Sequence, residues 1–175
     1  MQTNKCIAGV NGGYFAADTQ RSPIGLLKHQ GKTYHKLSRG AFTVAGVLYD
    51  TGKEIKLERS SHLTTPVDNM VEAIQGGPFL IEKGKIVPGL DNKKLARRTF
   101  VATDGMGSWC IAITSPTTLQ KLAIWLSKPG TLGKLKPKSV LNLDGGTSTA
   151  IWIAQPYLYK APFKEVRNFV GIRPR

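Results

Sequence analysis

Residues 140–149 read VLNLDGGTST, and this stretch decides what kind of fold the chain adopts. The apolar run Val140–Leu143 is typical of a buried strand, and the glycine pair that follows ends it in a turn. Side chains alternate between the two faces of a strand, so Asn142 and Asp144 lie on one face and Leu143 on the other. A carboxamide, a carboxylate and the hydroxyls beyond the glycines therefore gather at one strand end.

Two more segments join a polar residue to a glycine pair. Asn11-Gly12-Gly13 directly follows an apolar run, and Gln75-Gly76-Gly77 directly precedes one. Glycine lets the backbone approach a ligand closely and presents unobstructed N–H groups to an anion. The same pairs also serve as tight turns or bulges. The residues alone leave both interpretations open for all three segments, Gly145-Gly146 included.

Short apolar runs separated by 19 glycines and 10 prolines indicate a strand-rich domain. Lys83-Gly84 predicts a tight hairpin, because glycine supplies the positive φ that such a turn requires. Residues 104–107 predict another turn. The expected strands are Cys6–Val10, Ile24–Lys28, Phe42–Leu48, Glu54–Leu57, Phe79–Glu82, Lys85–Val87, Thr99–Thr103, Trp109–Thr114, Val140–Leu143, Ala150–Ala154 and Val166–Ile172.

One helix is expected after the strand that ends at Thr114. Ser115 suits its N-cap, Pro116 its first position and Pro129-Gly130 its end. Its apolar residues fall at helical spacing: Leu119, Leu122, Ala123 and Leu126. A second, shorter helix is expected near Pro66–Ala73. Helices inserted among many short strands predict the α+β class, here a twisted, mixed and largely antiparallel β-sheet core with a few packed helices, forming a single domain over residues 1–175.

The charge balance is strongly basic, with 25 Lys and Arg against 11 Asp and Glu and a net charge of +14. Such a surface attracts anions: nucleic acid, anionic lipid, acidic glycans or phosphorylated substrates. The 41% hydrophobic content is too high for a disordered chain. No run of about 18 apolar residues is present, so no membrane span is expected. The lysines crowd residues 83–98 and 121–138, which flank the glycine motifs in sequence.

The cysteines and histidines carry little chemistry. Cys6 and Cys110 either pair across the fold or lie buried as thiols, and we favour the buried thiols. The three histidines, His29, His35 and His62, stand in polar segments and are expected at the surface, with no metal. The first ten residues are no signal peptide. Because the first motif follows at once, we expect the chain to belong to a longer precursor that supplies preceding strands.

Asp144 is the only acidic residue between Asp104 and Glu165, in a stretch rich in lysine. A carboxylate in basic surroundings is expected to stay ionised, which suits a nucleophile, a base or a stabiliser of positive charge. An Asp that closes a turn is the alternative. Arg97-Arg98 begins a predicted strand, and a guanidinium fork matches phosphate oxygens, so one of the two is a candidate anion clamp. A plain surface arginine is the other interpretation.

Taken together and in order, the motifs resemble the phosphodiester glycosidase family. They are NGGYF, PIGL, QGGPFLIEKGKIV, RRTFVATD, LNLDGGTST and VRNFVGIRPR, which together run from residue 11 to the C-terminus. The resemblance implies hydrolysis of a sugar-1-phosphodiester at the anomeric carbon–oxygen bond, on a glycan, glycolipid or cell-surface polymer. It also implies an extracytoplasmic location. Where relatives often carry a serine pair after Asp-Gly-Gly, this chain has hydroxyls at residues 147–149.

The resemblance implies a role for each motif residue. Asp144 stabilises the positive charge of the transition state or acts as nucleophile or base, and Arg98 neutralises the phosphate. Glu72 and Asp18 rank above Asp104 as partners of Asp144. The expected substrate-binding residues are Asn11, Gly12, Gly13, Gln75, Gly76, Gly77, Asn142, Gly145, Gly146, Thr147, Ser148 and Asn168. No cofactor is expected, and a cation bound near Asp144 stays an open alternative. The expected partner is a sugar phosphodiester or anionic glycan.

Two other functions stay open. A non-catalytic glycan- or cell-wall-binding domain would keep the glycine turns but would not need the carboxylate. A nucleic-acid-binding protein is suggested by charge alone and needs exposed aromatics between its basic residues. Because most aromatics fall inside predicted strands, the nucleic-acid hypothesis ranks last.

Overall fold

A computed structural model describes residues 5–174, which form three antiparallel β-sheets and one α-helix. Sheet I holds both ends of the described chain, in the order β13-β12-β1-β14. Its central strand β1 pairs with two late strands, so that Val10 lies opposite Ile151 on one side and Val170 on the other. The bounds are β1 (Ala8–Asn11), β12 (Ile151–Ile153), β13 (Leu158–Lys160) and β14 (Phe169–Ile172).

Sheet II has the order β10-β9-β11-β7-β8 and is covered on one face by α1 (Leu119–Leu126). Leu122 and Leu126 of the helix pack with Leu80 and Phe100 of the sheet, which gives this half of the molecule its own core. Thr118 caps the helix, its hydroxyl accepting a 3.2 Å hydrogen bond from the Lys121 N–H. The bounds are β7 (Phe79–Glu82), β8 (Lys85–Ile86), β9 (Thr99–Thr103), β10 (Trp109–Ile113) and β11 (Ser139–Asn142).

Sheet III has the order β3-β2-β6-β4-β5 and is buried around Val47 and Tyr49. Short 3-10 turns η2 (Phe42–Val44) and η3 (Val67–Asn69) lie next to its strands, and a third turn, η4 (Gly146–Ser148), follows β11. The bounds are β2 (Leu27–His29), β3 (Lys32–His35), β4 (Gly46–Asp50), β5 (Ile55–Arg59) and β6 (Glu72–Gly76).

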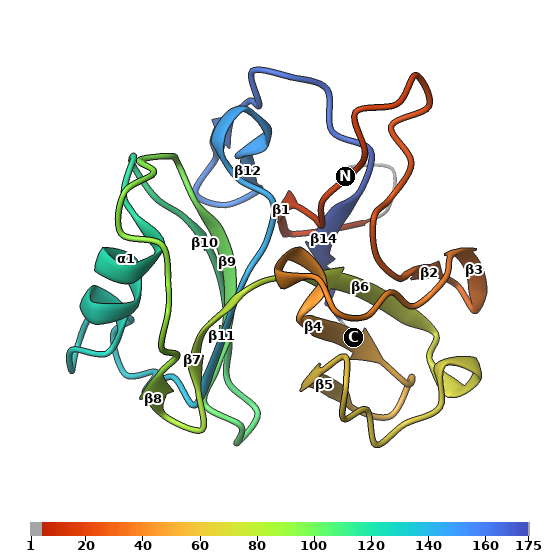
Figure 1. Ribbon diagram of the computed structural model, residues 1–175, viewed down its shortest axis with the longest axis horizontal. Coiled ribbons are helices and arrows are strands. Elements are labelled where there is room, and N and C mark those ends of the chain that lie inside the picture. The colour runs from red at the N-terminus through yellow and green to blue at the C-terminus, as the bar shows by residue number, and fades with distance from the viewer. Residues whose placement is uncertain (1–4, 175) are drawn as a thin grey trace.

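Figure 1 shows sheet II with α1 on one side, sheet III on the other, and sheet I above the junction between them. The chain crosses from sheet III to sheet II once in mid-chain, through Gly77-Pro78 between β6 and β7. Arg59 of β5 and Glu82 of β7 bridge the two sheets, with Nε and Nη2 donating at 2.7 and 2.8 Å to the two carboxylate oxygens. A third core, which contains Val10, Phe79 and Leu141, joins sheet I to sheet II.

The prediction of short strands is confirmed for most of the chain. The hairpin β7–β8 turns at Lys83 and Gly84, with φ values of 51° and 75°. The predicted turn at 104–107 joins β9 to β10, where Asp104 Oδ1 accepts hydrogen bonds from the N–H groups of Met106 and Ser108.

The helix predictions need correction. The predicted N-cap Ser115 and first residue Pro116 precede the helix, which begins three residues later behind Thr118. Residues 66–73 form no α-helix: η3 takes their first half, and β6 begins at Glu72. The first three residues of the predicted strand Phe42–Leu48 form η2. Among residues 5–174, the predicted few packed helices reduce to α1 and short 3-10 turns, and every strand pairing is antiparallel rather than mixed.

No disulfide links Cys6 to Cys110, and both thiols are half-buried. Burial raises the pKa of the Cys110 thiol. His29 and His62 are exposed and His35 is half-buried, in agreement with the expected surface positions. Within the described chain, no helix combines the length and the apolar character that crossing a bilayer requires.

Candidate active site at the junction of the three sheets

The three glycine segments meet at the junction of the three sheets. The carbonyl of Gly12 accepts a 3.0 Å hydrogen bond from the Asp144 N–H, and Asn11 Nδ2 donates at 2.7 Å to the Asp144 carbonyl. From the third segment, the Gly77 carbonyl accepts from the Tyr14 hydroxyl at 3.0 Å and from Asn142 Nδ2 at 3.0 Å. Strand ends far apart in sequence therefore surround one carboxylate.

Most of these positions require glycine because a Cβ atom there would overlap another segment of the chain. A Cβ on Gly12 would overlap the side chain of Asn168, and one on Gly13 would overlap the carbonyl of Gln75. A Cβ on Gly77 would overlap the carbonyl of Phe42, and one on Gly145 would lie 2.7 Å from the carbonyl of Arg97. Gly76 is similarly enclosed, by Asn142 and Leu143. The close approach is to the backbone or side chains of the protein itself and not toward open space, so these pairs serve packing first.

Gly146 differs from the other glycines of the motifs. Its φ is +61°, a conformation that side chains other than glycine rarely adopt, and a Cβ there would meet open space. Its N–H donates to the Arg97 carbonyl at 2.8 Å. Gly146 therefore sets the backbone direction of η4, the turn that carries Thr147 and Ser148.

Asn11 is buried and holds the junction together through its side chain. Besides the bond to Asp144, its Oδ1 accepts from the Thr99 hydroxyl at 2.7 Å and from the Ala150 N–H at 3.0 Å. It thus connects β1, β9 and the segment after η4. These contacts give Asn11 a positioning role, since its oxygen is already occupied.

Asp144 is half-buried and carries the site's carboxylate. Its Oδ1 accepts from the Gly145 N–H at 2.8 Å. Burial raises the pKa of Asp144 above the usual value, against weaker lowering by the Ser148 hydroxyl, the Gly145 N–H and Lys94. The sequence predicted a carboxyl whose basic neighbours keep it ionised. In the structure, loss of water outweighs those neighbours.

Tyr14 lies beside Asp144 and Arg98 and was not among the predicted site residues. Its hydroxyl accepts from Asn142 Nδ2 at 2.8 Å. Burial raises the pKa of Tyr14 well above its usual value, with the charge of Asp144 adding to the rise and that of Arg98 opposing it. The phenol therefore stays neutral between a carboxylate and a guanidinium. Tyr14 is part of the motif NGGYF, but the sequence pattern did not predict the direction in which its side chain points.

Arg98 is buried at the start of β9, with 7% of its surface exposed. Its Nε donates to the Thr117 carbonyl at 3.1 Å, and its Nη2 donates to the Lys94 carbonyl at 2.6 Å. No group among residues 5–174 accepts a hydrogen bond from Nη1. Burial lowers the pKa of Arg98, while Tyr14 and Asp91 raise it. A guanidinium with an unused N–H edge near a carboxylate suits the predicted anion clamp.

Arg97, the other candidate, is engaged with the turn η4. Its Nε donates to the Gly146 carbonyl at 3.2 Å, and its Nη2 to the Thr149 carbonyl at 3.1 Å. Its guanidinium stacks 4.3 Å from the ring centre of Phe163, whose N–H donates to the Thr147 carbonyl at 2.7 Å. Arg97 therefore fixes the turn that follows Asp144.

Gln75 has a fully satisfied side chain. Its Oε1 accepts from the N–H groups of Leu26 and Ser38 at 2.5 and 2.9 Å. Its Nε2 donates to the carbonyls of Ser38 and Val44 at 2.9 and 3.0 Å. With both hydrogens and both lone pairs in use, the carboxamide ties three segments of sheet III together and offers nothing to a substrate.

The predicted partner carboxylates are not brought to Asp144. Glu72 lies at the far end of β6 from Gly76, about 13 Å away along the strand, and binds His29 Nδ1 at 2.9 Å. Asp18 is exposed in the loop after Tyr14 and accepts from the Ser22 N–H at 3.0 Å. Asp104, ranked third, closes the β9–β10 turn as expected. Placement of these residues depended on pairings between distant strands, which the sequence does not reveal.

Three buried side-chain oxygens lack a hydrogen-bond partner within residues 5–174, and all belong to the motifs at this junction: Asn142 Oδ1, Thr149 Oγ1 and Asn168 Oδ1. Buried polar atoms in proteins are nearly always paired with protein or water. Asn168 also accepts from the Gly12 N–H at 2.9 Å through its carbonyl. Ser148 is buried beside Asp144, whereas Thr147 is exposed. The junction therefore retains acceptors that hydroxyl groups or water can fill.

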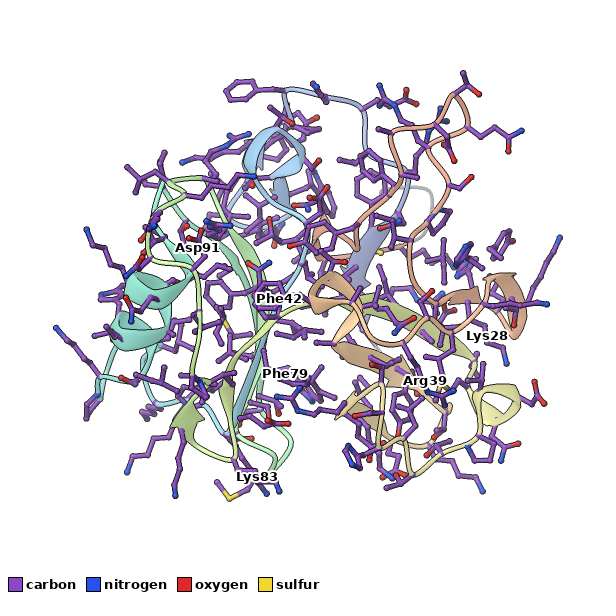
Figure 2. All side chains as sticks on the ribbon, viewed as in Figure 1. Lys28, Arg39, Phe42, Phe79, Lys83 and Asp91 are labelled. Carbon is purple, nitrogen blue, oxygen red and sulfur yellow. The ribbon has the colours of Figure 1, made fainter. Side chains whose placement is uncertain are left out.

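The basic side chains are less concentrated at the site than their sequence positions suggest. Figure 2 shows Asp91 and Lys83 at opposite ends of sheet II. Lys83 lies in the β7–β8 turn, where the next residue, Gly84, donates to the Lys138 carbonyl at the distant start of β11. Lys94 is the lysine whose charge acts on Asp144. Lys94 precedes Arg98 by four residues, and in a loop this spacing does not predict that the two side chains lie near the same site.

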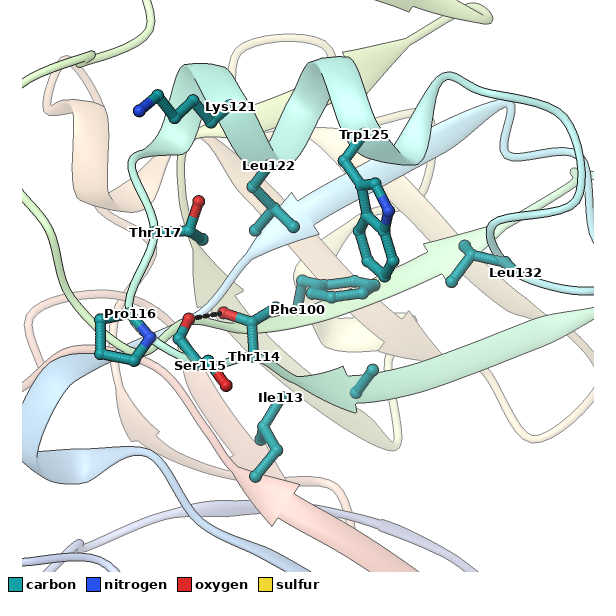
Figure 3. Close-up of a pocket in the computed structure, with 11 residues that line it drawn as sticks. Phe100, Ile113, Thr114, Ser115, Pro116, Thr117, Lys121, Leu122, Trp125 and Leu132 are labelled. Atoms are coloured by element: carbon teal, nitrogen blue, oxygen red, sulfur yellow. Dashed lines mark hydrogen bonds between the residues drawn. The ribbon is translucent and has the colours of Figure 1, made fainter.

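Two of the hollows formed by residues 5–174 lie away from the Asp144 carboxylate. One, of about 410 Å³, lies beneath α1 and is lined by Phe100, Leu122, Trp125 and neighbouring residues (Figure 3). None of the predicted site residues lines it. The other, of about 580 Å³, borders Asn11 on sheet I. No group of three His, Cys, Asp or Glu side chains in the described part of the chain is arranged to hold a metal ion.

Solved structures similar to this chain include the following two. The catalytic domain of zebrafish N-acetylglucosamine-1-phosphodiester alpha-N-acetylglucosaminidase, auto-inhibited by its pro-peptide, is 20% identical with a TM-score of 0.71. That match covers 99% of this chain and 65% of the zebrafish chain. A hypothetical protein from Synechocystis is 15% identical with a TM-score of 0.61, over 97% of this chain and 52% of the other.

These likenesses show a shared fold, and the chain spans about two thirds of the zebrafish domain's length. No curated protein matches the chain. The sequence profile of the phosphodiester glycosidases matches residues 4–173, nearly the whole chain. The chain belongs to the phosphodiester glycosidase family.

Proposed function

We propose that the chain hydrolyses a sugar-1-phosphodiester by cleaving the bond between the anomeric carbon and the phosphate oxygen. The observation that carries this proposal is the grouping of the Asp144 carboxylate and the Arg98 guanidinium around the neutral phenol of Tyr14. One group suits developing positive charge on the sugar, and the other suits the negative phosphate. The family assignment and the zebrafish relative's stated substrate class support the same reaction.

Asp144 faces the sugar in this proposal. Cleavage passes through an oxocarbenium-like state, and a half-buried carboxylate interacts more strongly with that charge than a hydrated one. The C–O bond breaks with its electron pair going to the phosphate oxygen, and water supplies the oxygen that adds to the anomeric carbon. The water's proton passes to the phosphate or to solvent.

Arg98 holds the departing phosphate. Its Nε and Nη2 are bound to backbone carbonyls, so the guanidinium is fixed before substrate arrives and its unused Nη1 edge can donate to a phosphate oxygen. A phosphomonoester leaves far more readily than a sugar hydroxyl. The reaction therefore does not need a second carboxyl group as a strong general acid.

The remaining motif residues orient the sugar and the catalytic loop. Ser148, Asn142 and Asn168 supply polar atoms near Asp144, while Asn11 and Arg97 hold the backbone that carries it. The substrate is a glycan, glycolipid or cell-surface polymer that carries the phosphodiester. The proposed location is extracytoplasmic, and no cofactor takes part.

The test is hydrolysis of a panel of aryl and nucleotide-sugar phosphodiesters by the wild type and by Asp144→Asn. We expect Asp144→Asn to lower kcat by at least about a hundredfold while far-UV circular dichroism stays unchanged. Asp104→Asn removes a turn carboxylate of equal charge and is expected to keep full activity. Equal turnover by Asp144→Asn and the wild type would refute the proposal. If the wild type and both variants bind glycan but none of them hydrolyses a substrate of the panel, a non-catalytic binding domain is favoured instead.

A further inference from the structure

The outward face of sheet I carries a groove of about 580 Å³ that the proposed reaction does not use. Cross-strand pairing places Tyr159 of β13, Trp152 of β12 and Gly9 of β1 side by side, so their side chains share one face of the sheet. Gly9 has no side chain, which leaves a gap beside the indole ring. The floor of the groove is therefore a glycine, and its wall is aromatic.

Aromatic rings surround this floor and remain in contact with water. Tyr157 is 72% exposed, Tyr159 55% and Phe169 51%. Phe169 pairs with Asn11 in the register of β14 against β1 and borders the groove on the other side of Gly9. Large exposed aromatics clustered round one hollow are typical of a binding surface.

Charged side chains gather at one edge of the groove, around Glu165. Glu165 lines it, with its carboxylate 3.9 Å from Arg21 Nη1 and 3.5 Å from Arg167 Nη1. Arg21 also donates at 2.8 Å to the Glu165 carbonyl, which fixes the two arginines on either side of one carboxylate. With exposed Lys164 next to it, this edge carries three positive charges against one negative.

The groove and the candidate active site have one residue in common, Asn11. Asn11 lines the groove and also donates to the carbonyl of Asp144. The segment that covers the groove from Pro162 onward includes Phe163, which binds the turn η4 through the Thr147 carbonyl. The groove therefore adjoins the segments that position Asp144.

We propose that this groove binds a sugar ring of an anionic polysaccharide, as a subsite apart from Asp144. Aromatic faces stack on the apolar faces of sugar rings, the Glu165 carboxylate accepts from sugar hydroxyls, and the arginines and lysine attract acidic groups along the polymer. This subsite rests on the proposed function in one respect: the polymer bound in the groove is taken to be the one that carries the cleaved phosphodiester.

Affinity electrophoresis in gels containing polygalacturonate tests the groove separately from catalysis, because this polymer has acidic sugars but no phosphodiester. We expect the wild type and Asp144→Asn to be retarded equally, and Tyr159→Ala to bind about tenfold more weakly. Tyr159→Phe keeps the ring and should bind nearly as the wild type does. Tyr34→Ala, which removes a 56% exposed tyrosine from sheet III, is the matched control.

A gel containing polyaspartate separates sugar recognition from charge. All variants should be retarded alike by this polymer, since the basic surface is unchanged. Equal weakening of Tyr159→Ala in both gels, or no weakening in either, would overturn the proposal. Turnover of a small aryl phosphodiester should be the same in Tyr159→Ala and the wild type, so loss of the groove and failure of the catalytic assignment give different results.

Discussion

The side-chain amide of Asn11 donates a 2.7 Å hydrogen bond to the main-chain carbonyl of Asp144, 133 residues further along the chain. The same side chain accepts from Thr99 and Ala150 through its oxygen. One buried carboxamide thus joins three separate segments and sets the position of the carboxylate. The site exists only where the first strand meets the middle and the end of the chain.

Replacing Asn11 by Ala should destabilise the fold and misplace Asp144. The change leaves the Ala150 N–H and the Asp144 carbonyl without their partner in a buried place, which costs about 2–4 kcal/mol of unfolding free energy. Urea unfolding followed by tryptophan fluorescence measures this cost. Asn92 is an exposed asparagine and serves as the matched control, since Asn92→Ala is expected to change stability by less than about 0.5 kcal/mol. Similar stability of both variants would contradict the role given to Asn11.

Lysine substitution should separate the two adjacent arginines. Arg98→Lys loses the planar fork that holds the phosphate, and kcat/KM for a phosphodiester should fall by about a hundredfold or more. Its bonds to the Thr117 and Lys94 carbonyls are lost too, so some unfolding free energy is lost, but the larger effect should be on kcat/KM. Arg97→Lys loses the two bonds to the turn η4 and the stacking on Phe163, so the larger change should be in stability. Steady-state kinetics and thermal unfolding of both variants measure the two effects. The reverse pattern would mean that Arg97 is the anion clamp.

Asp144→Asn should make the protein more stable near neutral pH than the wild type. The folded-state pKa of Asp144 is raised by burial, so ionisation is less favourable in the folded than in the unfolded chain. The wild type therefore loses stability as the pH rises from about 3.9, the unfolded value, through the folded pKa. Thermal unfolding at pH 3 and pH 7 should show a higher Tm for the variant at pH 7 and no difference at pH 3.

Asp104 provides a control of opposite sign for that experiment. The Ser108 and Met106 groups that bind its carboxylate lower the pKa of Asp104, so its ionised form favours the folded state. Asp104→Asn should therefore show no gain in Tm at pH 7. A gain in Asp104→Asn equal to that in Asp144→Asn would point to a general effect of net charge and not to the burial of one carboxyl.

Gly77→Ala should be among the more damaging single-methyl additions. Its Cβ would overlap the Phe42 carbonyl and lie 3.0 Å from the Ala45 nitrogen, which are backbone atoms that cannot rotate away. In the view of Figure 2, Phe42 lies between sheets II and III, and 52% of its surface is exposed. We expect a loss of about 2–3 kcal/mol. Gly31→Ala, with φ +78° but nothing within 4 Å of the added carbon, should lose only about 1–2 kcal/mol. Chemical denaturation of both variants measures the loss of unfolding free energy and so distinguishes the cost of atomic overlap at residue 77 from the cost of a positive φ at residue 31.

Local patterns predicted the strands that have strong apolar runs or tight turns. The hairpin β7–β8 follows from Lys83-Gly84, and β9–β10 from the turn at 104–107. Strands β3 and β13 were missed because their side chains are mostly exposed and polar or aromatic, without alternation of burial. The start of strand β6 fell within the short helix predicted near Pro66–Ala73, for which the periodicity is weak. Its true neighbours, β2 and β4, are far away in sequence.

The candidate site was predictable in its parts and not in its arrangement. The motifs placed Asp144, Asn142 and Arg98 correctly at strand ends. The motifs did not predict that the Gln75 side chain is fully hydrogen-bonded to four backbone groups, or that Glu72 lies at the opposite end of β6. Tyr14 and Lys94 came to the site through contacts between distant segments, which local spacing does not encode.

The pairing of β1 with β12 and β14 also has a consequence for biosynthesis. While the chain is being made, the sheet that carries Asn11 lacks both neighbouring strands until β12 and β14 follow the strands of the other two sheets. Sheets II and III take their strands from residues 27–142 and can assemble earlier. Since pairings of such long sequence separation form slowly, the carboxylate should be locked in place at the end of folding. A nascent chain that stops before β12 would have its two other sheets but not the two strand pairings of β1, which carries Asn11.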